Sequence, residues 1–311
     1  MFKKIVYFLV IVVFILLNSV SLSSQNSVSI ENKQQLEFRH DNDFVLFTDR
    51  YYSSGLFLSY RKLLSKGFFK PNREQLDFIL QQEVYTPSQT QSTNSEIFDR
   101  PYVGFSSVTA SWSTATESQL FRTDILLGIA GLNSGAGGLQ RAFHDLVGIL
   151  NSPLWVNELA NSFHINLYLS YVKEWQIAPT PFGISFALIP NIALGSRDIY
   201  VAPESVVYFG KKNKVTNSIS YNRLGVEDNE LYFALRSGYR RVFYNGLIEG
   251  NLFGDNSLLT QDSTNNVLFF GLDLNRRLKR SDYKFGVRYN SAETDTASGH
   301  AFVTVSYGLR F

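Results

Sequence analysis

Ala301-Phe302-Val303-Thr304-Val305-Ser306-Tyr307-Gly308-Leu309-Arg310-Phe311 closes the chain and decides its fold. Side chains of a strand alternate between its two faces. One face of this segment therefore carries Val303, Val305, Tyr307, Leu309 and Phe311. The other face carries small or polar residues, Thr304, Ser306, Gly308 and Arg310. This alternation predicts a strand that is apolar on one side only, which fits a soluble sandwich and a membrane barrel equally well.

The carboxyl end of this strand favours the membrane barrel. The strand runs to the last residue, and that residue is the aromatic Phe311. Such an ending resembles the terminal signal by which bacterial outer-membrane barrels are recognised for assembly.

The amino-terminal residues point to export. Lys3 and Lys4 precede an apolar run from Ile5 to Leu17, and small polar residues follow. This order is typical of a secretory signal peptide, which we predict over residues 1–24. The alternative is an uncleaved anchor, but the run is shorter than the ~20 apolar residues that span a bilayer. The chain has no cysteine, which excludes a lipoprotein signal and disulfide chemistry.

Composition agrees with a barrel. The chain has 17 Tyr and 26 Phe, yet its mean hydropathy is only −0.07. A helical membrane protein would show several long apolar runs, and none follows Leu17. A barrel needs apolar residues only at alternate positions and places aromatic residues at both membrane interfaces. The net charge of +2 gives no support for nucleic-acid binding.

Alternating segments recur along the whole chain between turn-rich stretches. We predict about twelve strands, at 35–39, 55–64, 75–85, 102–113, 120–129, 165–175, 184–194, 200–211, 231–241, 267–274, 283–289 and 301–311. An even number is what single-chain bacterial barrels have. The sequence therefore predicts one all-β domain over residues 25–311, a transmembrane antiparallel β-barrel in the outer membrane.

One segment departs from the strand pattern. After a glycine-rich run at 135–138, Leu139, Phe143, Leu146 and Leu150 recur at helical spacing and predict a short helix with one apolar face. Gln140 and His144 are four residues apart and therefore lie on one side of that helix. A helix between barrel strands is either a plug or part of a functional loop. On the simpler interpretation, His144 is a surface histidine on a gating helix.

A second unusual patch follows the first predicted strand. His40-Asp41-Asn42-Asp43 and Asp49 bring three carboxylates and an amide together, and the run Tyr51-Tyr52-Ser53-Ser54-Gly55 enters the next strand. Carboxylate and amide oxygens are the ligands of a hard cation such as calcium. Asp and Asn are also ordinary loop residues, and the spacing matches no EF-hand loop.

Taken together, these patches resemble the lipid A 3′-O-deacylase family of outer-membrane enzymes. The matching elements occur in the order of the family: Asn42-Asp43, the run 48–55, Asp99-Arg100-Pro101-Tyr102-Val103-Gly104, the glycine-rich segment with Gln140 and His144, and Pro153-Leu154-Trp155. The resemblance implies a twelve-stranded barrel whose site lies between the wall and a short helix. It also implies hydrolysis of the ester of the 3′-linked acyloxyacyl chain of lipid A, with dependence on calcium.

Carried over by position, the resemblance implies a role for each matched residue. His144 would be the base that activates water, Gln140 would orient it or the substrate, and Asn42 would help position the site. Asp43 would bind calcium, and Ser53 stands where the family has Thr or Ser. The substrate would be lipopolysaccharide in the outer leaflet, and we expect the barrel to act as a monomer. A histidine base suits ester hydrolysis near neutral pH, and the chain has no Gly-x-Ser-x-Gly elbow.

Two positions depart from the family. Leu150 stands where the family usually has a Glu six residues after the histidine, and Glu158 is a candidate replacement as a metal ligand. These departures keep a second interpretation open, that of a porin-like or structural barrel without catalysis. A third is an outer-membrane phospholipase with an acyl-enzyme serine. Convergence of Asn42, Asp43, Ser53 and His144 on a cleft open to lipid would favour the deacylase.

Overall fold

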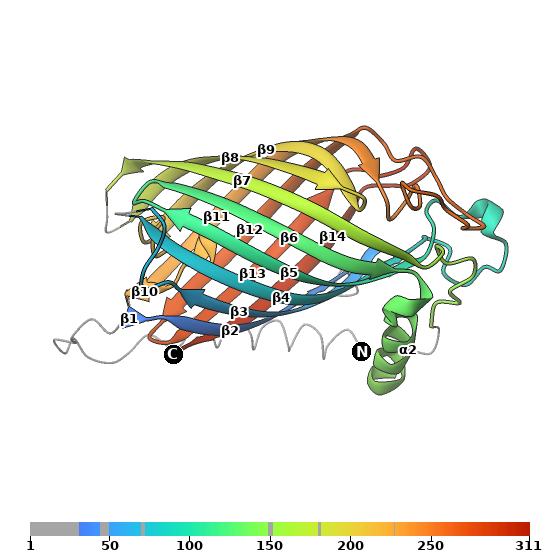
Figure 1. The fold of residues 1–311 in the computed structure, drawn as a ribbon, viewed down its shortest axis with the longest axis horizontal. Coiled ribbons are helices and arrows are strands. Elements are labelled where there is room, and N and C mark those ends of the chain that lie inside the picture. The colour runs from blue at the N-terminus through green and yellow to red at the C-terminus, as the bar shows by residue number, and fades with distance from the viewer. Residues whose placement is uncertain (1–30, 44–49, 70–71, 149–151, 180–181, 227) are drawn as a thin grey trace.

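The computed structural model describes residues 31–43, 50–69, 72–148, 152–179, 182–226 and 228–311. Twelve of the described strands form a closed antiparallel barrel (Figure 1). In chain order they are β2 (Gln34–Asn42), β3 (Tyr51–Leu63), β4 (Arg73–Thr86), β5 (Val103–Ala115), β6 (Gln119–Ala130), β7 (Ser162–Ala178), β8 (Gly183–Gly195), β9 (Asp198–Lys211), β11 (Glu230–Asn245), β12 (Asn266–Leu278), β13 (Ser281–Asn290) and β14 (His300–Arg310). The predicted barrel is confirmed, and each predicted segment falls on one of these strands. The predicted signal peptide and Leu150 lie outside the described residues.

The terminal strand closes the barrel. β14 pairs with β2, with Val303 opposite Asn42 and Arg310 opposite Gln35. Its apolar face points outward, and Tyr307 is 45% exposed. Its other face lines the lumen, where Arg310 is fully buried. The alternation in residues 301–311 therefore separates a lipid-facing side from a polar interior, as a barrel in a membrane requires.

The two ends of the barrel differ. At the end that holds the carboxyl terminus, tight turns join several strand pairs (Figure 1). At the other end, long connections follow β4, β6 and β11, and they carry η2 (Ser95–Ile97), η3 (Leu132–Ser134) and α2 (Ala136–Val147). In outer-membrane barrels the short turns face the periplasm and the long loops face outward. Within the described residues, no helix is long and apolar enough to cross a membrane.

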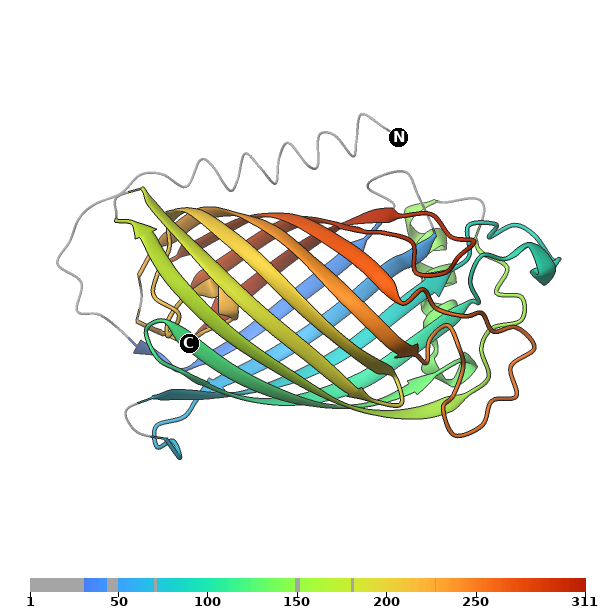
Figure 2. The ribbon, with the colours of Figure 1, turned by 90° about the horizontal axis from the view of Figure 1, so that it is seen from above.

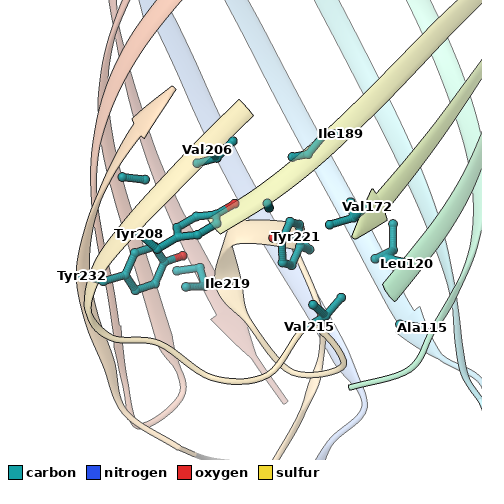
Figure 3. Close-up of a cluster of buried hydrophobic side chains, with 12 residues drawn as sticks. Ala115, Leu120, Val172, Ile189, Val206, Tyr208, Val215, Ile219, Tyr221 and Tyr232 are labelled. Atoms are coloured by element: carbon teal, nitrogen blue, oxygen red, sulfur yellow. The ribbon is translucent and has the colours of Figure 1, made fainter. Parts of the chain in front are cut away.

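The connection between β9 and β11 fills the carboxyl-terminal end of the lumen. It contains η4 (Ile219–Tyr221) and β10 (Gly225–Val226), which pairs with β1 (Glu31–Asn32). Figure 3 shows Val215, Ile219 and Tyr221 packed against Val206 and Tyr208 on the barrel strands. We call residues 212–226 the plug segment. In Figure 2 it lies inside the barrel, beside the carboxyl terminus.

Buried charges attach the plug segment to the barrel. Arg277 on β12 makes a two-bond contact with Asp282, with both N···O distances 2.7 Å, and donates to the carbonyl of Arg223 at 3.0 Å. Glu230 accepts from the Ser218 hydroxyl at 2.7 Å and from the Ile219 amide at 2.8 Å. A hydrogen bond to a charged group contributes about 1.5–3 kcal/mol to stability. These contacts therefore hold the plug segment in place.

A cavity of about 720 Å³ lies in the lumen above the plug segment. Ile219 and Asn222 line it from the plug, and charges of both signs line it from the strands, including Arg61, Glu204 and Asp273. Many of these charges are paired across neighbouring strands, as in the contact of the Arg236 Nε with Asp273 at 2.6 Å. The lumen is thus a polar interior that is closed by chain at one end.

Candidate active site

Helix α2 lies beside the outside of the barrel, at the end with the long loops (Figure 1). It follows Gly135 and precedes Gly148, and both glycines have φ of 73°, the left-handed conformation that commonly ends a helix at its C′ position. The helix was predicted over residues 139–150. It begins three residues earlier, because Gly137 and Gly138 belong to its first turn, and it stops at the cap of Gly148. Its place outside the wall excludes the plug interpretation for this helix.

The helix turns its polar face to the barrel and its apolar face outward. Gln140 and His144 are 6% and 5% exposed, whereas Leu146 is 84% exposed. Leu139 and Phe143 are exposed on the same outward side. In water this arrangement would be unfavourable, since apolar area would remain hydrated. Beside a membrane barrel the outward face meets lipid, and the polar side chains are shielded against the wall.

The wall beneath the start of α2 is polar and small. Gln82 on β4 and Ser106 on β5 point outward, and both donate to the carbonyl of Ser134, at 2.9 and 2.8 Å. Gly104 on β5 leaves room for the helix, because a Cβ there would lie 2.3 Å from the Cβ of Ala136. These outward positions would be apolar on an ordinary lipid-facing strand. They therefore form a seat for η3 and the first turn of α2.

Ser53 lies under the helix because β3 is irregular there. The pairing of β3 with β4 shifts between Tyr52 and Ser54, so Ser53 is the extra residue of a β-bulge. Its hydroxyl is buried and lies 3.4 Å from the Nε2 of Gln140. A bulge re-aims a side chain, and here it brings a strand hydroxyl within reach of the helix amide.

Trp155 orients Gln140 from the other side. Its indole N–H donates to the Oε1 of Gln140 at 2.8 Å, and its ring stacks on Tyr102 with centroids 5.4 Å apart. Because the amide oxygen of Gln140 accepts from Trp155, the NH₂ group of Gln140 points toward Ser53. The motif Pro153-Leu154-Trp155 includes this tryptophan, but the sequence predicts no positioning role for it. The signal in the sequence that could have indicated this role is a tryptophan a few residues after the predicted helix.

Asp43 is fully buried beside Ser53. The amide of Asp43 donates to the carbonyl of Ser53 at 3.2 Å, and its Oδ2 accepts from the amide of Arg50 at 2.9 Å. Asn42, the last residue of β2, pairs with Ser54 of β3. The structure therefore brings Asn42, Asp43 and Ser53 together at the ends of two neighbouring strands.

His144 joins this group from the helix. It lies one turn after Gln140 on the same side of α2, and it is buried. The ring of the preceding Phe143 lies 6.2 Å from the ring of His40 on β2, which places this part of α2 over the outward face of β2. Ser53 and Gln140 thus meet between the barrel wall and α2, Asn42 and Asp43 lie next to Ser53 at the strand ends, and His144 lies one turn further along the buried side of the helix.

The Asp99-Arg100-Pro101-Tyr102 motif supports the site and does not enter it. Asp99 accepts from the hydroxyl of Tyr51 at 2.8 Å and from the amide of Ser88 at 2.9 Å. Tyr51 has φ of 61°, a conformation unusual for a non-glycine residue, at the start of the strand that carries Ser53. Asp99 therefore helps to hold the entry of β3.

Glu158 lies near the beginning of α2. Its Oε1 accepts from the amide of Gly104 at 3.2 Å, and the positive charge of Arg141 favours the ionised form of the carboxyl. Burial raises the pKa of Glu158 to about 6 in spite of both interactions. This carboxylate is bound to the seat of the helix.

The donor set of the site suits a hard cation. Asp43 supplies carboxylate oxygens and Ser53 a hydroxyl oxygen, and both are buried. Oxygen ligands of this kind are those that calcium takes in proteins. Within the described part of the chain, no group of three or more His, Asp or Glu side chains is arranged to hold a metal ion. A calcium ion here would therefore need oxygen ligands in addition to those of Asp43 and Ser53.

Comparison with known proteins agrees with this architecture. The structure of LpxR from Salmonella typhimurium superposes with a TM-score of 0.75 at 17% identity, and the match covers 89% of this chain and 100% of that one. The β domain of the Bordetella autotransporter BrkA matches with a TM-score of 0.42 at 11% identity, covering 90% of this chain and 99% of that one. No curated protein matches the chain. The family model described as outer membrane protein LpxR matches residues 9–311. The chain therefore belongs to the LpxR family of outer-membrane proteins, the lipid A 3′-O-deacylase family that its motifs resemble.

Proposed function

We propose that this protein is a lipid A deacylase that hydrolyses the ester of the 3′-linked acyloxyacyl chain. The observation that carries the proposal is the burial of Gln140 and His144 on the wall-facing side of α2, with the Gln140 amide nitrogen 3.4 Å from the hydroxyl of Ser53. A lipid ester can reach such a site from the membrane, because the outward face of α2 is apolar. Membership of the LpxR family supports the same substrate.

His144 is the proposed general base. It takes a proton from a water molecule as the water oxygen attacks the acyl carbonyl carbon. The same proton is then available for the sugar oxygen that leaves when the ester C–O bond breaks. Gln140 is held by Trp155 and orients the reacting groups, and Asn42 helps to position the substrate. Removing a general base usually slows a reaction about 10²–10⁴-fold.

Calcium is the proposed cofactor, with Asp43 and Ser53 as ligands from this chain. Bound there, it would supply positive charge close to where the oxyanion of the tetrahedral intermediate forms. The proposal leaves Glu158 out of the ligand set, because its carboxylate accepts from Gly104 and lies near Arg141. Ser53 is proposed as a ligand, and its hydroxyl lies 3.4 Å from the Nε2 of Gln140.

The test is mass spectrometry of lipid A from cells that produce the wild type or His144→Ala. We expect loss of the 3′ acyl chain only with the wild type, and only when calcium is present. His40→Gln is the matched control, because His40 lies on the outward wall beside Phe143 and has no proposed part in the chemistry. Identical lipid A from wild-type and His144→Ala cells would refute the proposal and favour a barrel without catalysis.

A further inference from the structure

A second cavity, of about 370 Å³, lies on the outside of the barrel. It is a groove in the lipid-facing surface of β2 to β6, lined by Leu36, Leu58, Phe78, Leu80, Val108 and Ile125, among others. None of its lining residues is charged. It lies on the other side of the barrel wall from the luminal cavity, whose lining is mostly polar.

The groove exists because a small side chain interrupts a row of large ones. Ala110 on β5 pairs with Phe78 on β4 and with Ile125 on β6. All three point outward and are exposed. The single methyl group of Ala110 leaves a notch between its two larger neighbours. A large residue at this position would fill the notch.

The groove begins directly below the site. In the pairing of β4 with β5, Gln82 is opposite Ser106, and these two hold η3 to the wall. The next outward pair is Leu80 with Val108, and the one after it is Phe78 with Ala110. Four residues of strand separate Ser106 from Ala110, which is about 13 Å along the strand. With a strand tilt of roughly 40°, the notch lies about 10 Å deeper in the membrane than the seat of the helix.

We propose that this groove binds one hydrocarbon chain of the lipid A molecule whose ester lies at His144. The inference rests on the proposed function and adds the residue that sets chain length. Each leaflet contributes about half of a hydrocarbon core of roughly 30 Å. A chain that descends from an ester at the α2 level therefore reaches the notch at Ala110 within its own leaflet. The groove follows the strands that carry the site, so one extended chain can occupy both.

Steric exclusion is the expected source of selectivity. Surrounding lipid is as apolar as the groove, so burial of a chain there brings little hydrophobic gain. The shape of the groove decides which chains fit, and a misfit of one methylene in an apolar pocket is worth about tenfold or more in rate. Ala110→Phe should block the deep end of the groove, and Phe78→Ala should extend it.

The experiment compares two lipid A preparations in detergent micelles, one with a short 3′ chain and one with a chain four carbons longer. We expect Ala110→Phe to lower the ratio of long-chain to short-chain hydrolysis by about tenfold and Phe78→Ala to raise it. Ser237→Phe is the matched control, because Ser237 is an exposed outward residue of β11, away from the groove. Heat-modified gel mobility shows that each variant is folded. An unchanged ratio in both groove variants, or an equal change in the control, would overturn the inference.

A binding measurement separates this inference from the proposed reaction. The same two lipids are bound to His144→Ala and to His144→Ala with Ala110→Phe. Weaker binding of the long chain by the double variant alone supports the groove, even if the wild type proves to hydrolyse no lipid A. Equal binding by both proteins rejects the groove, even if the wild type is an active deacylase. Displacement of the long lipid A by a phospholipid of the same chain length would show that the groove holds any membrane lipid, and would likewise reject the inference.

Discussion

Single side chains set the geometry of the site through contacts from three parts of the chain. Ser53 is placed by a bulge in β3, Gln140 by helix α2, and Trp155 by the loop that follows it. The amide of Gln140 has only one orientation in which its oxygen accepts from Trp155 and its nitrogen faces Ser53. A fixed amide beside a reacting group is useful, because positioning is achieved before the reaction begins.

Replacing Trp155 by Phe should reduce activity without unfolding the barrel. The phenyl ring retains stacking on Tyr102 but cannot donate to Gln140. A hydrogen bond of this kind contributes about 1 kcal/mol, so we expect a loss of roughly fivefold in kcat/KM for lipid A. Trp175→Phe, on the exposed outward face of β7, is the control and should have wild-type activity. Equal activity of both variants would show that Gln140 needs no such support.

Glu158 should make the stability of its loop depend on pH. Because burial raises its folded-state pKa to about 6, above the ordinary value near 4.3, the folded state retains the proton at a pH where the unfolded state has lost it. The ionised carboxylate therefore destabilises the loop at residues 152–160. This loss of stability is complete above about pH 6 and absent below about pH 4.3. Glu158→Gln keeps an acceptor for Gly104 and removes the charge. We expect slower hydrogen exchange than wild type in residues 152–160 at pH 7.5 and no difference at pH 4.

The opposite result for Glu158→Gln has a clear meaning. Faster exchange at pH 7.5 in the variant, together with weaker calcium dependence of activity, would show that the carboxylate binds the metal. That outcome would restore Glu158 to the ligand set.

At the scale of the elements, the important feature is the reversed orientation of α2. The sequence predicts an amphipathic helix, and in a soluble protein its apolar stripe would pack inward. Here Leu139, Phe143 and Leu146 face out and the polar face is buried, while Gly104, Gln82 and Ser106 form the seat for η3 and the first turn. The helix is thus held by polar contacts on one side and by lipid on the other.

Gly104→Ala should therefore displace the helix. A Cβ at Gly104 would lie 2.2 Å from the Oγ of Ser134 and 2.3 Å from the Cβ of Ala136, so η3 and the first turn of α2 must move. A shift of about 1 Å can cost 10²-fold in rate, and we expect a loss of that order in lipid A hydrolysis. The barrel should still fold, as judged by heat-modified mobility on gels.

Gly138→Ala is the matched control for that substitution. A Cβ at Gly138 would meet nothing within 4 Å, and alanine favours a helix over glycine by up to about 1 kcal/mol. Full activity in Gly138→Ala and a large loss in Gly104→Ala would support the seat. Equal effects would show that general flexibility of α2 matters, and not its contact with the wall.

At the scale of the whole molecule, the chain uses the outside of the barrel for the site and closes the inside. The plug segment fills the carboxyl-terminal end of the lumen and is tied to the strands by Arg277 and Glu230. A barrel that served as a channel would need an open path along its axis. The packing of Ile219 and Tyr221 in the lumen therefore disfavours the porin-like interpretation.

The wild-type protein should show no stepwise ion conductance in planar bilayers. Replacement of residues 214–224 by a short Gly-Ser linker should produce conductance, because the polar cavity above the plug would then open to the periplasmic side. Replacement of the exposed residues 252–254 in an outer loop is the control and should leave the bilayer sealed. Conductance of the wild type itself would contradict the closed lumen.

The sequence by itself determined the twelve strands, because alternation with a period of two is a local property and each strand repeats it. It also indicates the helix and the residues at 42–43, 53, 140 and 144, but its apolar spacing starts only at Leu139, because Gly137 and Gly138 in the first turn of α2 carry no side chain that shows the helical period. The plug segment was not predicted, because its apolar residues follow no regular period.

Only the tertiary structure decided which faces meet. The register of β2 with β3, the bulge at Ser53 and the seat at Gly104 bring Asp43, Ser53 and Gln140 together over separations of many residues. An apolar stripe on a helix specifies that one side avoids water, but it does not say whether that side meets a protein core or lipid. The closed barrel settles this point, because most of its outer surface is apolar, whereas Ser53 offers a polar partner to Gln140 on the wall-facing side of α2.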